Sequence, residues 1–419
     1  MAARGSIWGT LPPLAGSGIF AIGSGVLQTL MPLRLHALGY SAGEAGLVAS
    51  GYAGGFLIGC LVVSRLIASV GHVRASTACC AAAAVMILGF DWAPPLWGMV
   101  LLEAAVGIAA SGLATVTESW LNELVQPERR GRLLTLYMIV LTIAWGAGQL
   151  AAIQIDPGSS RMLILTAGCY ALALIPVAAV NVASPKPPTR VRPELRRVFR
   201  ISPAGMLSCF YTGLVAATVT STGPIYGAAR GLDQSDIVLL MIALPVGGLV
   251  LQGPLGHLSD RVDRRRVLFV MALAVALVSG ALVLIGAAAP FWLLAGLFAL
   301  LGGLAECFYP IGVALSNDRA EPADYVAVSS NLLLVWAAGG MAGPLIATAA
   351  LERGGAQAYF FYPMGLSLAL AAYLLWRLAR RPKIDPALRE EFVAYPTTSA
   401  EVYEWSPHKP LDRGPPPKG

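Results

Sequence analysis

The chain has 419 residues, of which 56% are hydrophobic and only 12% are charged. Soluble globular domains carry about a quarter charged residues, so this composition excludes an ordinary soluble protein. The formal net charge of +6 does not indicate nucleic-acid binding, because the basic residues are confined to short connections between apolar stretches. The six cysteines all fall inside apolar stretches, without the loop spacing of a zinc site or a disulfide framework. We therefore expect no metal and no cofactor.

Apolar stretches long enough to cross a bilayer as helices recur along almost the whole chain. The first of them has no small-residue cleavage site, so we interpret it as a retained helix and not as a signal peptide. The sequence therefore predicts an all-α membrane protein. We predict twelve spans, with cores at 10–33, 45–64, 75–92, 97–117, 133–154, 162–182, 203–225, 237–255, 267–288, 291–315, 328–350 and 360–377.

The basic residues between the spans predict the orientation in the membrane. Lys and Arg concentrate in the cytoplasmic connections of membrane proteins. Here the connections after even-numbered spans are the basic ones, with Arg65 and Arg74 after the second and residues 261–266 after the eighth. The odd-numbered connections hold at most one arginine each. We therefore predict a multi-pass protein of the bacterial inner (plasma) membrane with both termini in the cytoplasm.

A Pro-rich, basic stretch divides the spans into two sets of six. We predict an N-terminal six-helix bundle over residues 1–183, a cytoplasmic linker over 184–202, a C-terminal six-helix bundle over 203–380 and a cytoplasmic tail over 381–419. The tail is polar and cannot bury much apolar surface, so we expect it to be disordered.

The two halves also repeat each other in sequence, which is typical of transporters built from two related bundles. The matches keep one register through several helices. They pair Pro32 with Pro224, Gly39 with Gly231, Glu44 with Asp236 and Gly55 with Gly247, and at a slightly larger offset Gly107 with Gly302 and Gly148 with Gly343.

The most specific motif is the basic connection after the eighth span. Residues 256–266 read Gly-His-Leu-Ser-Asp-Arg-Val-Asp-Arg-Arg-Arg. This pattern resembles the signature loop of major facilitator superfamily transporters, which lies between the second and third helix of each half. The segments Glu-Ser-Trp-Leu-Asn at 118–122 and Ala-Glu-Cys-Phe-Tyr-Pro-Ile-Gly at 305–312 are similar to a bacterial branch of that family. The resemblance covers residues 8 to 380 and implies two pseudo-symmetric six-helix bundles.

The resemblance also implies a conformational latch in this loop. In the family, the aspartate at the position of Asp260 lies against a neighbouring helix end and joins the halves in the outward-open state, and Gly256 would permit close helix approach. We expect the arginines of the loop to pair with acids at the end of the tenth span, of which Asp318 is the candidate. These arginines are Arg261, Arg264 and Arg265.

The first half retains only part of this motif, because no aspartate stands where Asp260 stands in the second half. A carboxylate is instead available at Glu118, near the cytoplasmic end of the fourth span. We expect Glu118 to pair with Arg65 or Arg74.

Two acids inside the spans are candidates for proton coupling. Glu306 falls near the middle of the tenth span with no basic residue in the same helix. A charge at that depth costs roughly 2.5–3.5 kcal/mol, so such residues usually face water or a partner. Glu306 is therefore suited to carrying a proton or binding an amine. Glu103, four residues before Gly107, stands where many proton-coupled members carry an arginine. It either faces the interior or reaches the outer interface, and both interpretations stay open.

The resemblance further implies that the first, fourth, seventh and tenth helices line a central cavity. The residues predicted to border it, besides the two acids, are Gln28, Tyr211, Thr218, Thr222, Cys307 and Tyr309.

These features together predict a monomeric secondary transporter that moves a small solute by alternating access and is coupled to protons. No catalytic constellation appears, so we do not expect an enzyme, and the expected partners are the solute, protons and the lipid bilayer. Three alternatives remain. One is a copper importer of the same fold, since Met206, Cys209, Met241 and Cys307 are soft ligands. The others are a lipid or lysolipid flippase and a non-transporting membrane assembly or receptor protein.

Overall fold

The computed structural model describes residues 10–124, 130–179, 193–285, 288–321, 324–380, 392–393 and 397–399. These residues contain twelve membrane-length apolar helical segments and no strand, which confirms the predicted all-α fold with twelve spans. Because twelve successive spans alternate in direction, the first begins and the last ends on the same face of the bundle. We call this the tail face and the opposite one the far face.

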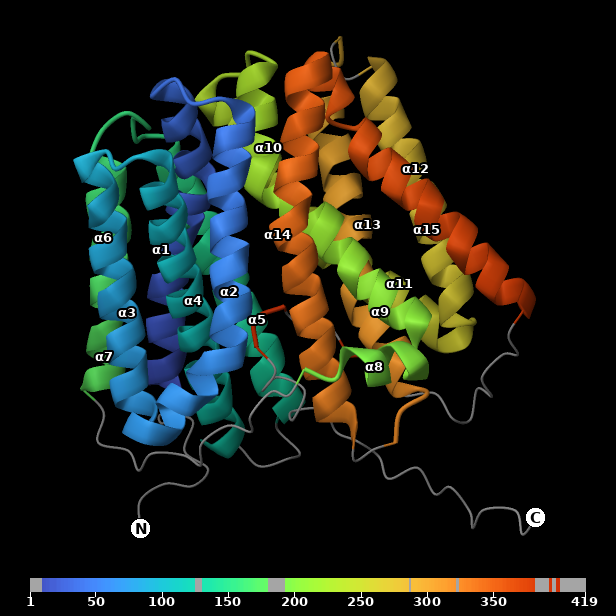
Figure 1. Cartoon of the computed structure of the whole chain (residues 1–419), viewed down its shortest axis with the longest axis horizontal. Coiled ribbons are helices and arrows are strands. Elements are labelled where there is room, and N and C mark those ends of the chain that lie inside the picture. Colours follow the sequence, from blue (N-terminus) through green and yellow to red (C-terminus); the bar gives the residue numbers. More distant parts are fainter. Residues whose placement is uncertain are drawn as a thin grey trace.

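The first half occupies one side of the molecule (Figure 1). It consists of α1 (Leu11–Ala37), α2 (Ala42–Val70), α3 (His72–Gly89) with the short η2 (Phe90–Trp92), α4 (Leu96–Leu124), α5 (Arg130–Ala152), and α6 (Arg161–Leu172) continued by α7 (Leu174–Ala178).

The second half occupies the other side. Its seventh span is built from α9 (Pro203–Thr212), a π-helical turn η4 (Gly213–Ala217) and α10 (Thr218–Ala229), and the remaining spans are α11 (Gln234–Arg261), α12 (Arg264–Ile285), α13 (Phe291–Asn317), α14 (Tyr325–Ala358) and α15 (Phe361–Arg380). The short α8 (Leu195–Ile201) precedes it within the predicted linker; linker residues 184–192 lie outside the described residues.

The turn after the first span of each half is built in the same way. Gly39 and Gly231 have positive φ angles of 84° and 76°, a conformation that glycine adopts without strain. The next helix then starts with a side-chain cap in both halves. Ser41 and Asp233 each accept a hydrogen bond from the backbone N–H three residues further on, at 3.2 and 2.7 Å, which satisfies a donor that a helix start leaves unpaired. The repeated sequence pattern therefore encodes repeated structure.

Close helix contacts repeat as well. Gly55 of α2 lies so near the backbone of Ala104 in α4 that a methyl group would overlap its carbonyl oxygen, and Gly247 of α11 lies in the same way on Ala299 of α13. Small residues let membrane helices approach to backbone contact. Because both the glycines and their partners are related by the sequence repeat, the two halves are pseudo-symmetric.

The halves meet along α2 and α14, which run side by side at the centre of Figure 1. On the far face, hydrogen bonds cross between them. The Gly43 N–H of α2 donates to Oε1 of Glu352 in α14 at 2.7 Å. The Gln234 amide of α11 donates to the Ala152 and Ile155 carbonyls at the end of α5, at 2.5 and 2.7 Å. The far face is therefore held closed.

Candidate functional site

The structure describes all of residues 301–318, and only Glu306 among them is not fully buried. Leu300 lies on the exposed stripe of α13. Successive helix residues are about 100° apart, so Glu306 points about 120° away from that stripe. Its carboxylate lies over Gly248 of α11, where a methyl group would overlap Oε2. No described residue hydrogen-bonds to it. Glu306 is thus a mid-span carboxyl that points into the protein and fills the room left by the missing side chain of Gly248.

Gln28 of α1 is also partly exposed, and its amide makes no hydrogen bond to any described residue. Ser24, one turn earlier, donates to the Phe20 carbonyl at 3.1 Å and lies 3.2 Å from the Tyr170 hydroxyl. The face of α1 around Ser24 and Gln28 is therefore polar, and the amide of Gln28 is available to a bound molecule.

Glu103 does not reach the outer interface. Only 5% of the residue is exposed, and Tyr52 of α2 and Tyr170 of α6 are polar neighbours close enough to interact electrostatically with it. Of the two interpretations left open by the sequence, the structure therefore supports the one that turns Glu103 toward the interior of the first half.

The signature loop is organised around Arg264. Its Nε donates to Asp318 Oδ2 at 2.9 Å, and both side chains are only 1% exposed. Its Nη2 lies 3.1 Å from Asp260 Oδ1, and its Nη1 donates to the Ser259 hydroxyl at 3.0 Å. The predicted pair with Asp318 is confirmed for Arg264. In this state Asp260 bonds to Arg264 of its own half and accepts the N–H of the tail residue Phe392.

The other two loop arginines behave differently from the prediction. Arg265 pairs with Asp263 within the loop, with Nη2–Oδ2 and Nε–Oδ1 distances of 2.8 and 3.1 Å. Arg261 is exposed and forms no ion pair with any described residue. Pairing of these two with an acid at the end of α13 is wrong, because Arg264 already fills the position beside Asp318.

Glu118 is bound by hydroxyl groups and not by the arginines that the sequence suggested. Its side chain is fully buried, and it accepts hydrogen bonds from the Tyr137 hydroxyl at 3.0 Å and from the hydroxyls of Thr398 and Ser399 in the tail. The pairing with Arg65 or Arg74 is wrong. Both arginines are exposed, where they keep their water, whereas an ion pair with Glu118 would require one of them to be desolvated.

The sequence matches the description Major Facilitator Superfamily over residues 14–248 and again over residues 205–410. The chain belongs to the Major Facilitator Superfamily. It is therefore a membrane transporter and not an enzyme. A protein of Yersinia pestis (strain Pestoides F) named "Uncharacterized MFS-type transporter" is 26% identical over 366 residues, which cover 86% of this chain and 94% of the relative. The MFS-type transporter YcaD of Salmonella heidelberg (strain SL476) is 26% identical over 371 residues, 88% of this chain and 96% of the relative.

Solved transporters of known fold are similar in three dimensions. The nucleoside transporter NupG superimposes with a TM-score of 0.72 at 12% identity, covering 89% of this chain and 99% of NupG. A D-xylose-proton symporter superimposes with a TM-score of 0.70 at 14% identity, covering 90% of this chain and 98% of the symporter. At these identities the likeness shows a shared fold.

Within this superfamily fold, the three residues of the seventh span that were predicted to border a cavity are buried inside the second half. Tyr211 shares a hydrogen bond of 2.6 Å with Ser367 of α15. Thr222 donates to a backbone carbonyl and lies 2.8 Å from the Tyr359 hydroxyl, and Thr218 is fully buried against α14. The prediction that these three residues border a cavity is wrong in this state, because all three are buried inside the second half and the hydroxyls of Tyr211 and Thr222 bond to other segments of it.

Cys307 and Tyr309, one and three residues after Glu306, are each only 1% exposed, so the prediction that these two residues border a cavity is also wrong in this state. Tyr309 lies toward the boundary between the halves. Its ring centroid is 6.5 Å from that of Trp336 in α14, which is 5.7 Å from that of Phe56 in α2. An aromatic row therefore crosses between the halves near mid-span. Sequence reasoning missed Trp336, since its own segment is uniformly apolar.

The soft ligands behind the copper-importer alternative are separate packing residues. Cys209 lies against Gly312 of α13, and Met241 lies against Gly223 of α10. Among the described residues, no group of three or more His, Cys, Asp or Glu side chains is placed to hold a metal ion.

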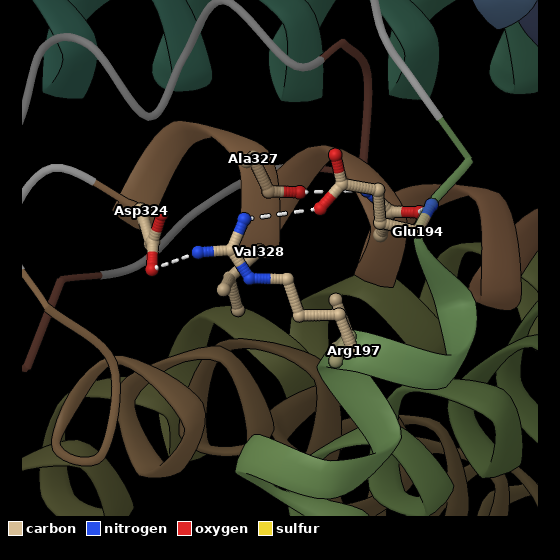
Figure 2. Close-up of a pocket in the computed structure, with 7 residues that line it drawn as sticks. Glu194, Arg197, Asp324, Ala327 and Val328 are labelled. Carbon is tan, nitrogen blue, oxygen red and sulfur yellow. Dashed lines mark hydrogen bonds and ion pairs between the residues drawn. The ribbon is translucent and has the colours of Figure 1, made fainter.

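A polar pocket joins the linker to the second half (Figure 2). Arg197 of α8 donates to Glu194 at 3.1 Å and to Asp324 at 2.6 Å, and Asn331 of α14 accepts from the Glu194 N–H at 2.7 Å. The hydrogen bond to Glu194 and the nearby Asp324 raise the pKa of the Arg197 guanidinium. These contacts anchor α8 to the start of α14. The linker's basic composition did not indicate them.

Proposed function

We propose that this transporter moves a small solute across the bacterial inner membrane by alternating access, as a monomer, and couples that movement to protons. The orientation follows from charge. The tail face carries the clustered arginines, such as Arg65 and Arg74, and basic residues favour the cytoplasmic side. Both termini are then cytoplasmic, and the far face is periplasmic.

The arrangement of the halves corresponds to an inward-facing state in this proposal. The far-face bonds of Glu352 and Gln234 hold the periplasmic side closed. Asp260, the latch residue of the outward-open state in the family, is here bonded to Arg264 of its own half. Alternating access would break the first set of bonds and re-form the latch.

The observation that carries proton coupling is the environment of Glu306. It is a mid-span carboxyl without a described hydrogen-bond partner, beside a glycine that leaves space for it. A charged carboxylate at this depth is costly unless water reaches it. Glu306 would therefore ionise when its side of the protein is open to water and bind a proton when it is enclosed, which links its proton to the conformational change.

A measurement without any known solute tests this assignment. Distances between paired labels on the tail face of the purified protein in nanodiscs should shift between two populations as pH is varied from about 5.5 to 8.5. Glu306→Gln, which keeps the shape and removes the titrating proton, should abolish the pH response. Glu103→Gln is the matched control, since it changes a buried carboxyl of the other half. A Glu306→Gln protein with an unchanged pH response would remove Glu306 from the coupling role.

A further inference from the structure

Part of the C-terminal tail is bound to the second half. The Phe392 N–H donates to Asp260, with N–O distances of 3.1 and 3.2 Å to the two carboxylate oxygens. The Phe392 ring lies on Gly256, so closely that a methyl group there would overlap the ring. Both contacts use residues of the signature loop, so this end of the tail covers the latch.

A few residues further on, the tail is bound to the first half. The hydroxyls of Thr398 and Ser399 donate to the two oxygens of Glu118 in α4. Ser399 is 1% exposed and Glu118 is fully buried. The tail therefore supplies two of the three hydroxyls that solvate this buried carboxylate, the third being Tyr137 of α5.

The tail was expected to lack fixed contacts, and for the described residues 392–393 and 397–399 the structure differs from that expectation. Between its two anchoring points, Val393 packs against a hydrophobic cluster that contains residues of both halves, among them Leu121 of α4 and Tyr309 of α13. Contacts from one short segment to both halves restrain the distance between the halves on this face. Any ligand that binds one state better than another shifts the population toward that state.

We propose that Phe392, Val393, Thr398 and Ser399 form an intramolecular bridge that binds the tail face between the two halves and stabilises the inward-facing state. The proposal rests on the alternating access proposed above. Asp260 is the point of competition. Phe392 occupies both Asp260 and Gly256 of the signature loop, so the bridge must leave before the outward-open latch forms. The tail is then an autoinhibitory element, and its release increases the outward-facing population.

Hydrogen exchange of the full chain in nanodiscs tests the docking step without reference to transport. Gly256→Ala should expel Phe392 and speed exchange of the peptide that contains its amide by about tenfold or more, since a bond to a carboxylate is lost. Gly253→Ala is the matched control: it lies one turn earlier in α11, and a methyl group there meets nothing within 4 Å. Equal exchange in the two variants would overturn the docking.

Distances between labels at Ser69 of α2 and Arg266 of α12, both exposed on the tail face, test the conformational step in a cysteine-free background. Thr398→Ala combined with Ser399→Ala should raise the outward-facing population about tenfold, whereas Thr397→Ala, which removes a hydroxyl without a described contact to Glu118, should not. If two populations are present but neither the double variant nor Gly256→Ala changes their ratio, the bridge is contradicted and alternating access is not. A single population in every protein contradicts alternating access itself, and with it the conformational role of the bridge.

Discussion

Replacing Asp318 by alanine should destabilise the transporter far more than replacing Asp260, although both acids bond the same arginine. Arg264 and Asp318 are each 1% exposed and 2.9 Å apart. Removing one partner of a buried ion pair leaves an uncompensated charge and costs about 3–5 kcal/mol. Because Arg264 keeps its bonds to Asp260 and to the Ser259 hydroxyl, we expect the lower end of that range for Asp318→Ala.

The Asp260 side chain is 28% exposed, so water partly solvates it and weakens its attraction to Arg264. A solvated pair of this kind contributes about 1 kcal/mol or less, and Asp260→Ala should cost no more than that. The two alanine variants therefore differ by about 2 kcal/mol or more in this account. A third variant, Arg264→Leu with Asp318→Leu, removes both charges and should lose less stability than Asp318→Ala alone.

Thermal unfolding in one detergent, followed with a dye that fluoresces on reaction with thiols, measures these differences. Five of the six cysteines are buried, so the signal appears when the helices separate. From highest to lowest unfolding temperature, the expected order is wild type, Asp260→Ala only slightly lower, the double leucine variant, and Asp318→Ala. Equal losses for Asp260→Ala and Asp318→Ala would refute the reasoning that burial decides the contribution of each pair.

Gly55→Ala should prevent stable folding, because its methyl group would overlap the Ala104 carbonyl; yield and monodispersity measure this against Gly253→Ala, and a well-folded Gly55→Ala protein would contradict the backbone contact. Thr222→Val should lower the unfolding temperature and leave solute transport rates within about twofold, since its hydroxyl bonds to Tyr359 at the end of α14 and a typical hydrogen bond contributes about 1 kcal/mol; a lost transport activity in a folded protein would return Thr222 to the solute site. A small membrane-permeant thiol reagent should modify Cys60, which is partly exposed, faster than Cys307, which is 1% exposed; mass spectrometry of the labelled peptides would show the reverse order if Cys307 bordered open space.

The number of spans and the repeat could be read from the sequence because both depend on local properties. An apolar stretch of about 20 residues has to be a helix in a membrane. A glycine at a helix end or a backbone contact, such as Gly39 or Gly55, leaves a mark that recurs at a fixed offset. The pair of Arg264 and Asp318 could also be predicted from the sequence, since opposite charges at adjacent span ends on one face have few other partners.

The direction in which polar side chains point could not be predicted from the sequence. Tyr211, Thr218 and Thr222 lie on a helix that the family places beside the cavity. In the structure they point to α14 and α15. The rotation of a helix about its axis is set by its neighbours, and a π-helical turn at Gly213–Ala217 shifts the phase of all residues beyond it. Composition alone gives neither the rotation of the helix nor the position of a π-helical turn.

The partners of Glu118 could not be predicted from the sequence for a different reason. A charge-based argument pairs this carboxylate with arginines that are expected on the same face of the membrane, Arg65 and Arg74. Its actual partners include hydroxyls about 280 positions away in a segment whose composition indicated disorder. Hydroxyl donors carry no charge that would single them out in a sequence.

Solute accumulation in proteoliposomes tests the central claim most directly. Reconstituted protein is screened with labelled solutes of several classes under an imposed pH gradient, and each active solute is then tested for accumulation and for exchange at equal pH. Glu306→Gln should abolish accumulation and leave exchange largely intact, while Glu103→Gln should reduce accumulation less. A Glu306→Gln protein that still concentrates solute with the normal dependence on the pH gradient would contradict the account.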